Sequence, residues 1–250
     1  MTMNGVPTLF PNGVSNAAVG SFGAGVPMLW PPQYYTWFDD FDAFRLDTAT
    51  DPVAYGDWLV SGTGGSAAVS DAFGGILAIS SGASDTNAFY AQWQGGNAGS
   101  VAETFTFEAG KELWFAARFA LVADVTDEAF IIGLAVADTS PIDAADGVFF
   151  LKADGAATLA LVSRIATPVS ASDTILTMVA GTYYEVGFHY NGIDAIKAYL
   201  GNSDGTWSYV GEVGISALPT TELAVTIGLL SGANDDKTAA VDWIFAARER

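Results

Sequence analysis

The feature that most constrains the fold is a series of short apolar runs separated by turn-forming residues. Roughly a dozen such runs follow one another from residue 74 to the C-terminus, at the spacing typical of an all-β sandwich or barrel. The run ELWFAARFALV, residues 112–122, alternates as a strand does, because every second residue of a strand points to the same face. Its core-facing residues are predicted to be Leu113, Phe115, Ala117, Phe119 and Leu121.

The connections between these runs agree with a chain of antiparallel strands. Asn191-Gly192 lies between two alternating runs and is the strongest short-range hairpin signal, and GNSDG at 201–205 predicts the next turn. The stretch at 126–137 could pass for a helix, but its Ile-Ile-Gly and its short length favour a buried strand. No repeat of about 20–50 residues is present, which argues against a solenoid or propeller. Two packed antiparallel sheets are therefore expected.

The charge balance excludes several classes of partner. The chain has 28 acidic and nine basic residues, a net charge of −19, which argues against binding nucleic-acid phosphates or anionic lipid. No apolar run approaches the roughly 18–20 residues of a membrane span, and the N-terminus lacks the pattern of a signal peptide. The absence of cysteine excludes disulfides, zinc–thiolate sites and thiol catalysis. We expect neither nucleic acid nor membrane as a partner.

The first 33 residues differ from the rest of the chain. They contain five prolines, five glycines and no charged residue, a composition that interrupts strands and helices. Their large apolar residues are Leu9, Phe10, Phe22, Met28, Leu29 and Trp30. A disordered tail is usually polar, although a frayed terminus is the alternative. We predict an extended N-terminal arm over 1–35, whose apolar residues bind a neighbouring subunit or another partner, and a sandwich domain over 36–250.

The sequence fits neither of two common enzymatic arrangements. The single histidine, His189, has no G-x-S-x-G nucleophile to assist, so a surface or interface position is the simpler interpretation. Glycoside hydrolysis needs two carboxylates close together, but Glu103 and Glu108 are five residues apart and would face opposite sides of a strand. We expect no catalytic residues.

The acidic stretch YYTWFDDFDAFRLD, residues 34–47, raises the question of a metal site. Asp40 and Asp42 would share one side of a strand, but calcium takes six to eight oxygen ligands, mostly from loops. Asp and Asn also begin turns and solubilise strand ends. We predict that Asp39, Asp40 and Asp42 are structural, and that the protein needs no metal or cofactor.

Aromatic residues make up 13% of the chain, and most occur among aliphatic residues, where core packing is their ordinary use. Exposed rings could instead stack on sugars. The candidates for such a row are Trp93, Tyr183, Tyr199 and Trp207.

Several segments together resemble the concanavalin A/laminin G-like jelly roll over about residues 36–250. They are WFDDF, ELWFAARF, DGVFFLK, YYEVGFHYNG followed by IKAYLG, and AAVDWIFAAR. The resemblance implies that WFDDF is the first strand, with Phe38 and Phe41 packed and the acids at an edge or in solvent. It also implies that the VDWI strand ends the fold beside the first strand.

Within this group the chain is similar to virion structural proteins of tailed bacteriophages, particularly head decoration or cement proteins. That resemblance implies a homotrimer on the outer surface of the capsid, which binds the major capsid protein and stabilises the lattice. The same domain occurs in tail fibres and bacterial glycan-binding modules. The alternative function is therefore a carbohydrate-binding adhesin or tail-fibre module, with a glycan as its ligand.

Overall fold

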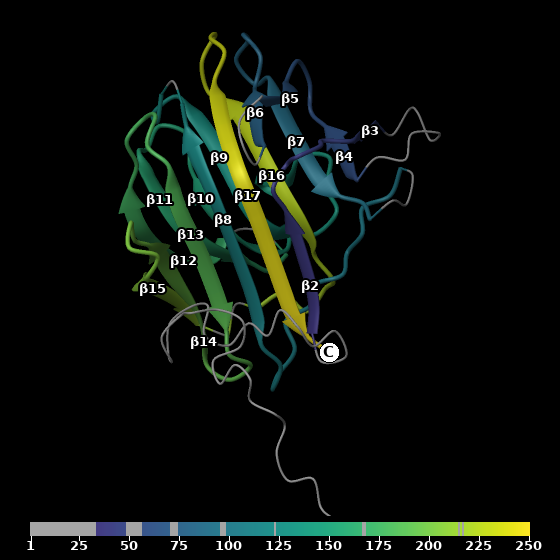
Figure 1. Cartoon of the computed structure of the whole chain (residues 1–250), viewed down its shortest axis with the longest axis vertical. Helices are drawn as coiled ribbons and strands as arrows, with labels where there is room; N and C mark the ends of the chain where they lie inside the picture. The colour runs from purple at the N-terminus through teal and green to yellow at the C-terminus, as the bar shows by residue number, and fades with distance from the viewer. Residues whose placement is uncertain are drawn as a thin grey trace, which may run out of the picture.

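The computed structural model describes residues 34–48, 57–70, 75–95, 99–122, 124–166, 169–214, 216 and 218–250. In these parts of the chain the strands form two sheets that pack face to face (Figure 1). The predicted arm, with its six apolar residues, lies outside the described residues apart from Tyr34 and Tyr35, which already belong to a strand.

One sheet, here called sheet A, has its strands in the order β12-β11-β10-β9-β16-β7-β4-β3. Their bounds are Val169–Thr177, Thr158–Arg164, Gly147–Lys152, Glu128–Ala135, Ala224–Ser231, Ala88–Trp93, Trp58–Ser61 and Leu46–Thr48. Neighbouring strands are antiparallel, except that β3 pairs with β4 in parallel.

The other sheet, sheet B, has the order β15-β14-β13-β8-β17-β6-β5, and β2 also pairs with β17. The bounds are Trp207–Gly214, Ala195–Gly201, Tyr184–Tyr190, Leu113–Leu121, Thr238–Glu249, Ile76–Ser80 and Ser66–Ser70, with β2 at Tyr34–Asp39. The antiparallel sandwich expected from the alternating runs is thus confirmed.

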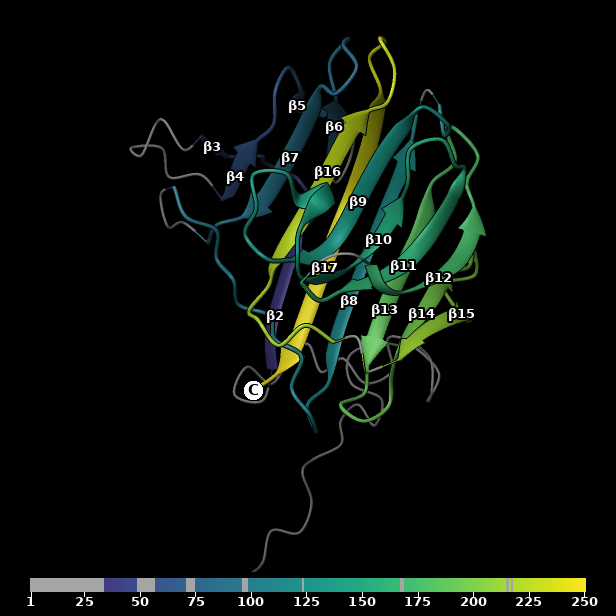
Figure 2. The same cartoon turned by 180° about the vertical axis from the view of Figure 1, so that it is seen from behind.

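The main core lies between the inner faces of the two sheets. The five predicted residues of β8 are all buried in it at 1% exposure or less. Strand β9 is buried along its whole length, which confirms that the stretch at 126–137 is a strand and not a helix. A short 3₁₀ helix, η1 (Pro141–Asp143), contacts β9 and β16 (Figure 2). Its Ile142 packs in a second, smaller apolar cluster.

The hairpin between β13 and β14 turns where the sequence predicted. Gly192 adopts a φ of +78°, and a Cβ there would lie 2.7 Å from the main-chain nitrogen of Lys111. Only glycine satisfies both requirements. The next predicted turn, at 201–205, joins β14 to β15.

The first and last strands lie side by side, as the resemblance implied. Strand β2 pairs with β17, with Phe38 opposite Phe245. The expectation that Phe38 packs in the core is wrong: its side chain is 59% exposed. Trp37 packs against the core instead, and strand alternation therefore directs Phe38 outward.

The acidic stretch after β2 is a turn. The strand ends at Asp39, so Asp40 and Asp42 do not share a strand face as expected. Phe41 adopts a positive φ of +54° and is completely buried, which confirms that it packs. Asp39 ends β2, which among the described strands pairs only with β17 and so lies at an edge of sheet B, as expected. Its carboxylate accepts hydrogen bonds from the Phe41 main-chain N–H (2.8 Å) and the Trp58 indole N–H (2.9 Å).

We predict that Asp39→Ala lowers the free energy of unfolding by about 2–3 kcal/mol, because it removes two hydrogen bonds to a charged acceptor. The matched control is Asp42→Ala, since Asp42 is exposed, and it should change stability by less than about 0.5 kcal/mol. Urea unfolding with and without a chelator measures both. A chelator-dependent loss of stability in the unmodified chain would instead indicate a metal site.

Candidate functional site

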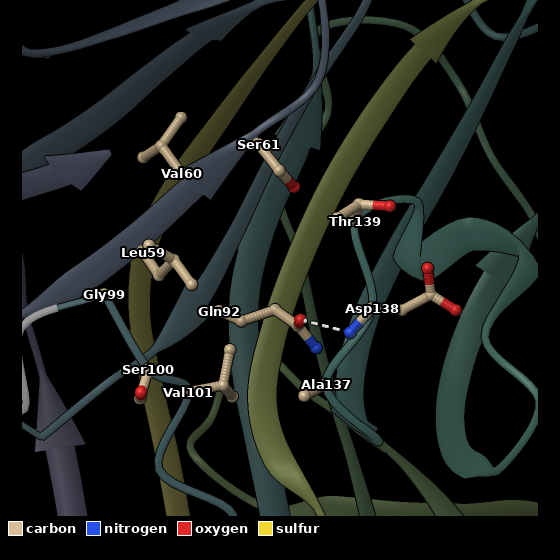
Figure 3. A pocket seen from close by; sticks show the side chains of 10 residues that line it. All are labelled: Leu59, Val60, Ser61, Gln92, Gly99, Ser100, Val101, Ala137, Asp138 and Thr139. Carbon is tan, nitrogen blue, oxygen red and sulfur yellow. Dashed lines mark hydrogen bonds between the residues drawn. The ribbon is translucent and has the colours of Figure 1, made fainter. Parts of the chain in front are cut away.

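A groove on the outer face of sheet A combines a defined hollow with side chains suited to binding a ligand (Figure 3). Its volume is about 450 Å³. The lining residues are Leu59, Val60, Ser61, Gln92, Gly99, Ser100, Val101, Ala137, Asp138 and Thr139. They come from β4, from β7, from the segment at 99–101 and from the loop that follows β9, so the groove exists only in the folded chain.

Gln92 connects the floor of the groove to its wall. On β7, Phe89 and Ala91 point into the core, so alternation turns Gln92 to the outer face. Its side-chain nitrogen donates to the Val136 carbonyl and to the Thr226 hydroxyl, both at 3.0 Å. Its oxygen accepts the Asp138 main-chain N–H at 2.9 Å (Figure 3). Gln92 is 2% exposed, so this support is shielded from water.

Three further contacts fix the loop after β9 in place. The Glu103 carboxylate accepts the Ala137 main-chain N–H at 2.6 Å, and the Asp138 carboxylate accepts that of Ser140 at 2.9 Å. Further along, the Arg164 guanidinium donates to the Ile142 carbonyl at 2.7 Å and lies 5.1 Å from the centre of the Phe149 ring. The groove wall is therefore formed before any ligand arrives, which reduces the ordering cost of binding.

The lining chemistry suits an uncharged, polyhydroxylated ligand. The hydroxyls of Ser61, Ser100 and Thr139 can donate and accept hydrogen bonds, and the Asp138 carboxylate can accept them. Leu59 and Val101 offer apolar contact. None of these described lining residues is basic, so the groove has no counter-charge for phosphate, sulfate or carboxylate ligands.

The four aromatic residues proposed to stack on sugars are not brought together. Trp93 lies on the core side of β7, with its ring centre 5.8 Å from that of Trp37. Tyr199 and Trp207 pack in one cluster on the outer face of sheet B. Tyr183 lies under Arg118, whose Cζ is 4.5 Å from the ring centre. None of the four lines the groove of sheet A.

Tyr183 does line a second hollow, also of about 450 Å³, on sheet B. Its lining residues are Arg118, Tyr183, Tyr184, Glu185, Leu200, Gly201, Asn202 and Ser203. Arg118 lies 3.6 Å (Nε to Oε1) from Glu185 and also pairs with Asp242. The charge of Arg118 is thus already neutralised within the chain. This makes the hollow on sheet B a weaker candidate for a ligand-binding site than the groove of sheet A.

His189 is packed against an aromatic ring and lies near a carboxylate. It stacks on Trp114 with ring centres 5.0 Å apart, and its Nε2 is 4.0 Å from a Glu112 oxygen. Burial is the main cause that lowers the pKa of His189 to about 4, with a smaller contribution from Lys197. The ring is therefore uncharged at neutral pH.

Within the part of the chain that the structure describes, no three His, Cys, Asp or Glu side chains gather closely enough to hold a metal ion. No helix among these residues is long and apolar enough to cross a membrane.

The lining of the groove escaped prediction because it mixes polar and apolar residues from four separate segments, with no sequence spacing of their own. The one available signal was Gln92, a polar residue within the apolar run NAFYAQWQ.

Comparisons with known proteins identify the fold. No protein-family model and no curated protein matches the chain. Among solved structures, a protein of unknown function from Shewanella oneidensis MR-1 is similar with a TM-score of 0.59, 13% identity and coverage of 87% of each chain. Peanut lectin, solved with a nine-residue peptide, has a TM-score of 0.54 and 8% identity, and the match covers 87% of this chain and 98% of the lectin.

A third similar structure is the CBM2 module of the evolved Dit of Lactobacillus casei BL23 phage J-1. Its TM-score is 0.50 at 10% identity, and the match covers 86% of this chain and 96% of the module. These likenesses confirm the predicted concanavalin A-like jelly roll. At such low identity they establish the fold alone.

Proposed function

We propose that the protein is a non-enzymatic binding module that holds a neutral saccharide in the groove of sheet A. The observation that carries this proposal is the prebuilt wall: Gln92, at 2% exposure, ties the Asp138 loop to the sheet beside three hydroxyl side chains. A few fixed polar groups beside apolar contacts are the usual composition of a small-ligand site. The shared fold of peanut lectin and of the phage CBM2 module supports the choice of ligand.

The roles of the nearby carboxylates support a module without catalysis. Hydrolysis of a glycosidic bond needs one carboxyl group to donate a proton and a second to act as base or nucleophile. Glu103 and Asp138 instead accept hydrogen bonds from main-chain N–H groups of the groove wall. Both carboxylates thus support the shape of the loop.

The proposal predicts that filling the groove abolishes saccharide binding. Leu59→Trp places a large ring in the groove, and we expect at least a tenfold loss of affinity for any neutral oligosaccharide that a glycan array identifies with the full chain. The matched control is Ile193→Trp, because Ile193 is 71% exposed in the β13–β14 turn, away from the groove. Undiminished binding by the Leu59→Trp variant, or no ligand among neutral glycans, would contradict the proposal.

A second candidate function is capsid decoration, as a homotrimer that binds the major capsid protein on the outer surface of a virion. The observation that favours it is the fold shared with a module of a bacteriophage protein. This candidate predicts a trimer in sedimentation velocity at micromolar concentration. A monomer under those conditions would count against self-association as the basis of such a role.

A further inference from the structure

The groove of sheet A runs along β4 and β7, and its two ends differ. The two strands are antiparallel, so Leu59 lies beside Gln92 towards one end and Ser61 lies beside Tyr90 towards the other. The first is here called the Trp93 end, because β7 ends at Trp93, and the second is called the Ser61 end. Whether a bound saccharide chain can continue past either end depends on what lies there.

A segment of the chain, residues 102–105, crosses the Trp93 end. Ala102 donates its main-chain N–H to the Trp93 carbonyl at 2.9 Å, and Thr104 donates its own to the Leu223 carbonyl at 3.0 Å. Leu223 directly precedes β16, which lies next to β7 in sheet A. The segment therefore passes across the end of the floor, from β7 to β16.

The same segment joins the two side walls of the groove. One wall contains residues 99–101 and the other is the loop after β9. Between them, the Glu103 carboxylate accepts the Ala137 main-chain N–H at 2.6 Å. Val101 and Ala137, one from each wall, lie at the same end of the groove in Figure 3. The walls thus meet at the Trp93 end and close it.

The Ser61 end has a different construction. Beyond Ser61 the chain continues through residues 62–64, all three of which are exposed, and Thr139 on the opposite wall is exposed as well. Figure 3 shows Ser61 and Thr139 on separate walls at this end. No hydrogen bond joins these two described side chains, so both hydroxyls are available to a ligand. The Ser61 end is therefore open to solvent.

We propose that the groove binds the terminal unit of a saccharide chain, with the rest of that chain leaving between Ser61 and Thr139. This inference rests on the proposed function and adds which part of a saccharide the groove holds. A chain bound through its interior needs two open ends, and the groove has one. Its volume of about 450 Å³ lies near the lower end of the range for small-ligand sites, which suits one end of a chain.

An extra sugar at the closed end would have to displace residues 102–105. Their hydrogen bonds to Trp93, Ala137 and Leu223 would then break. Phe105, which has no exposed surface, would lose its place in the main core. Both changes are unfavourable, because they leave polar groups without partners and expose apolar surface to water. The closed end should therefore exclude an added sugar.

Elongation of a saccharide at each of its two ends tests this inference on the full chain. The probes are the smallest neutral oligosaccharide that the glycan array identifies and two derivatives, one with a hexose added at the non-reducing end and one with a hexose added at the reducing end. Isothermal titration calorimetry measures their affinities. We expect one elongation to weaken binding by about tenfold or more, because it clashes with the closed end, and the other to change it by less than about threefold. Equal tolerance of both elongations would overturn the inference, and so would loss of binding with both.

A spin label provides an independent readout of the direction of the bound chain. A nitroxide is attached to the tolerated end of the oligosaccharide, which is then added to the ¹⁵N-labelled full chain. We expect the amide signals of Gly62, Thr63 and Thr139 to broaden, while those of Ala102 and Glu103 are retained. Broadening that is strongest at Ala102 and Glu103 would overturn the inference.

Failure of this inference is distinguishable from failure of the proposed function. If Leu59→Trp abolishes binding while both elongated probes bind as tightly as the parent, the groove holds the interior of a chain and only the inference fails. If the Leu59→Trp variant binds the parent oligosaccharide undiminished, the saccharide lies elsewhere and the proposed function itself fails.

Discussion

Replacing Trp58 with alanine is expected to lower the free energy of unfolding by about 3–5 kcal/mol, because it opens a large cavity in the core. Trp58 has no exposed surface, and its ring centre lies 5.6 Å from that of Trp37 and 6.0 Å from those of Phe41 and Phe44. Its indole N–H donates to Asp39. This one side chain therefore joins β2, the turn after it and β4.

The measurement is guanidinium unfolding of the wild-type chain and two variants. Trp58→Phe keeps most of the packing but removes the indole N–H, which leaves the Asp39 carboxylate with one partner fewer, so an intermediate loss of about 1–3 kcal/mol is expected. Ile193→Ala is the surface control, since Ile193 is 71% exposed. A loss below about 1 kcal/mol for Trp58→Ala would show that the aromatic cluster is not a stabilising centre.

Glu128→Gln is expected to stabilise the protein by about 3 kcal/mol at pH 8 and by less than about 1 kcal/mol at pH 5. Glu128 has no exposed surface, and neither of its carboxylate oxygens has a hydrogen-bond partner among the described residues. Burial is the main cause that raises the pKa of Glu128 from 4.5 to about 7, against a lowering contribution from Lys152. Lys152 is equally buried, and its ammonium donates to the Thr126 and Glu128 carbonyls.

The sign of the pH dependence follows from these two pKa values. Between pH 4.5 and about 7 the folded chain holds a proton on Glu128 that the unfolded chain has released. The free energy of unfolding therefore falls as the pH rises through this range, by roughly 1.4 kcal/mol per unit. Glutamine has no proton to lose, so the variant should lack this fall.

The control for this prediction is Glu222→Gln, because Glu222 is exposed. Urea unfolding at pH 5, 6, 7 and 8 provides the comparison, and the difference between the Glu128→Gln variant and the wild-type chain should grow with pH. If the Glu128→Gln variant is less stable than the wild-type chain at pH 8, the carboxylate is charged and stabilising in the folded protein, and the expectation fails.

The sandwich was predictable because strand alternation and turn chemistry are local. The alternation within Leu113–Leu121 identifies the core-facing residues without information from any other strand. Asn191-Gly192 likewise specifies its own hairpin. The position of Phe38 was not predictable, because β2 carries aromatic residues on both faces, and hydrophobicity alone does not say which face meets the core. The structure places Trp37 inward and Phe38 outward.

The groove depends on long-range contacts and therefore left little trace in the sequence. Ser61, Gln92 and Asp138 belong to segments that the pairing of β4, β7, β16 and β9 brings together. Aromatic content suggested sugar stacking at Tyr199 and Trp207, but those residues lie on sheet B. Aromatic residues in a sequence do not by themselves reveal which face of which sheet they occupy.

The most direct test of the account is to map where a saccharide binds. Amide chemical shifts of the ¹⁵N-labelled full chain are recorded while the best neutral oligosaccharide from the glycan array is added. We predict that the largest shifts arise at Ser61, Ser100 and Ala137–Thr139, together with the side-chain amide of Gln92, and that Leu59→Trp suppresses them. Shifts concentrated instead around Tyr183, Gly201 and Asn202 on sheet B would contradict the assignment of the binding site to the groove of sheet A.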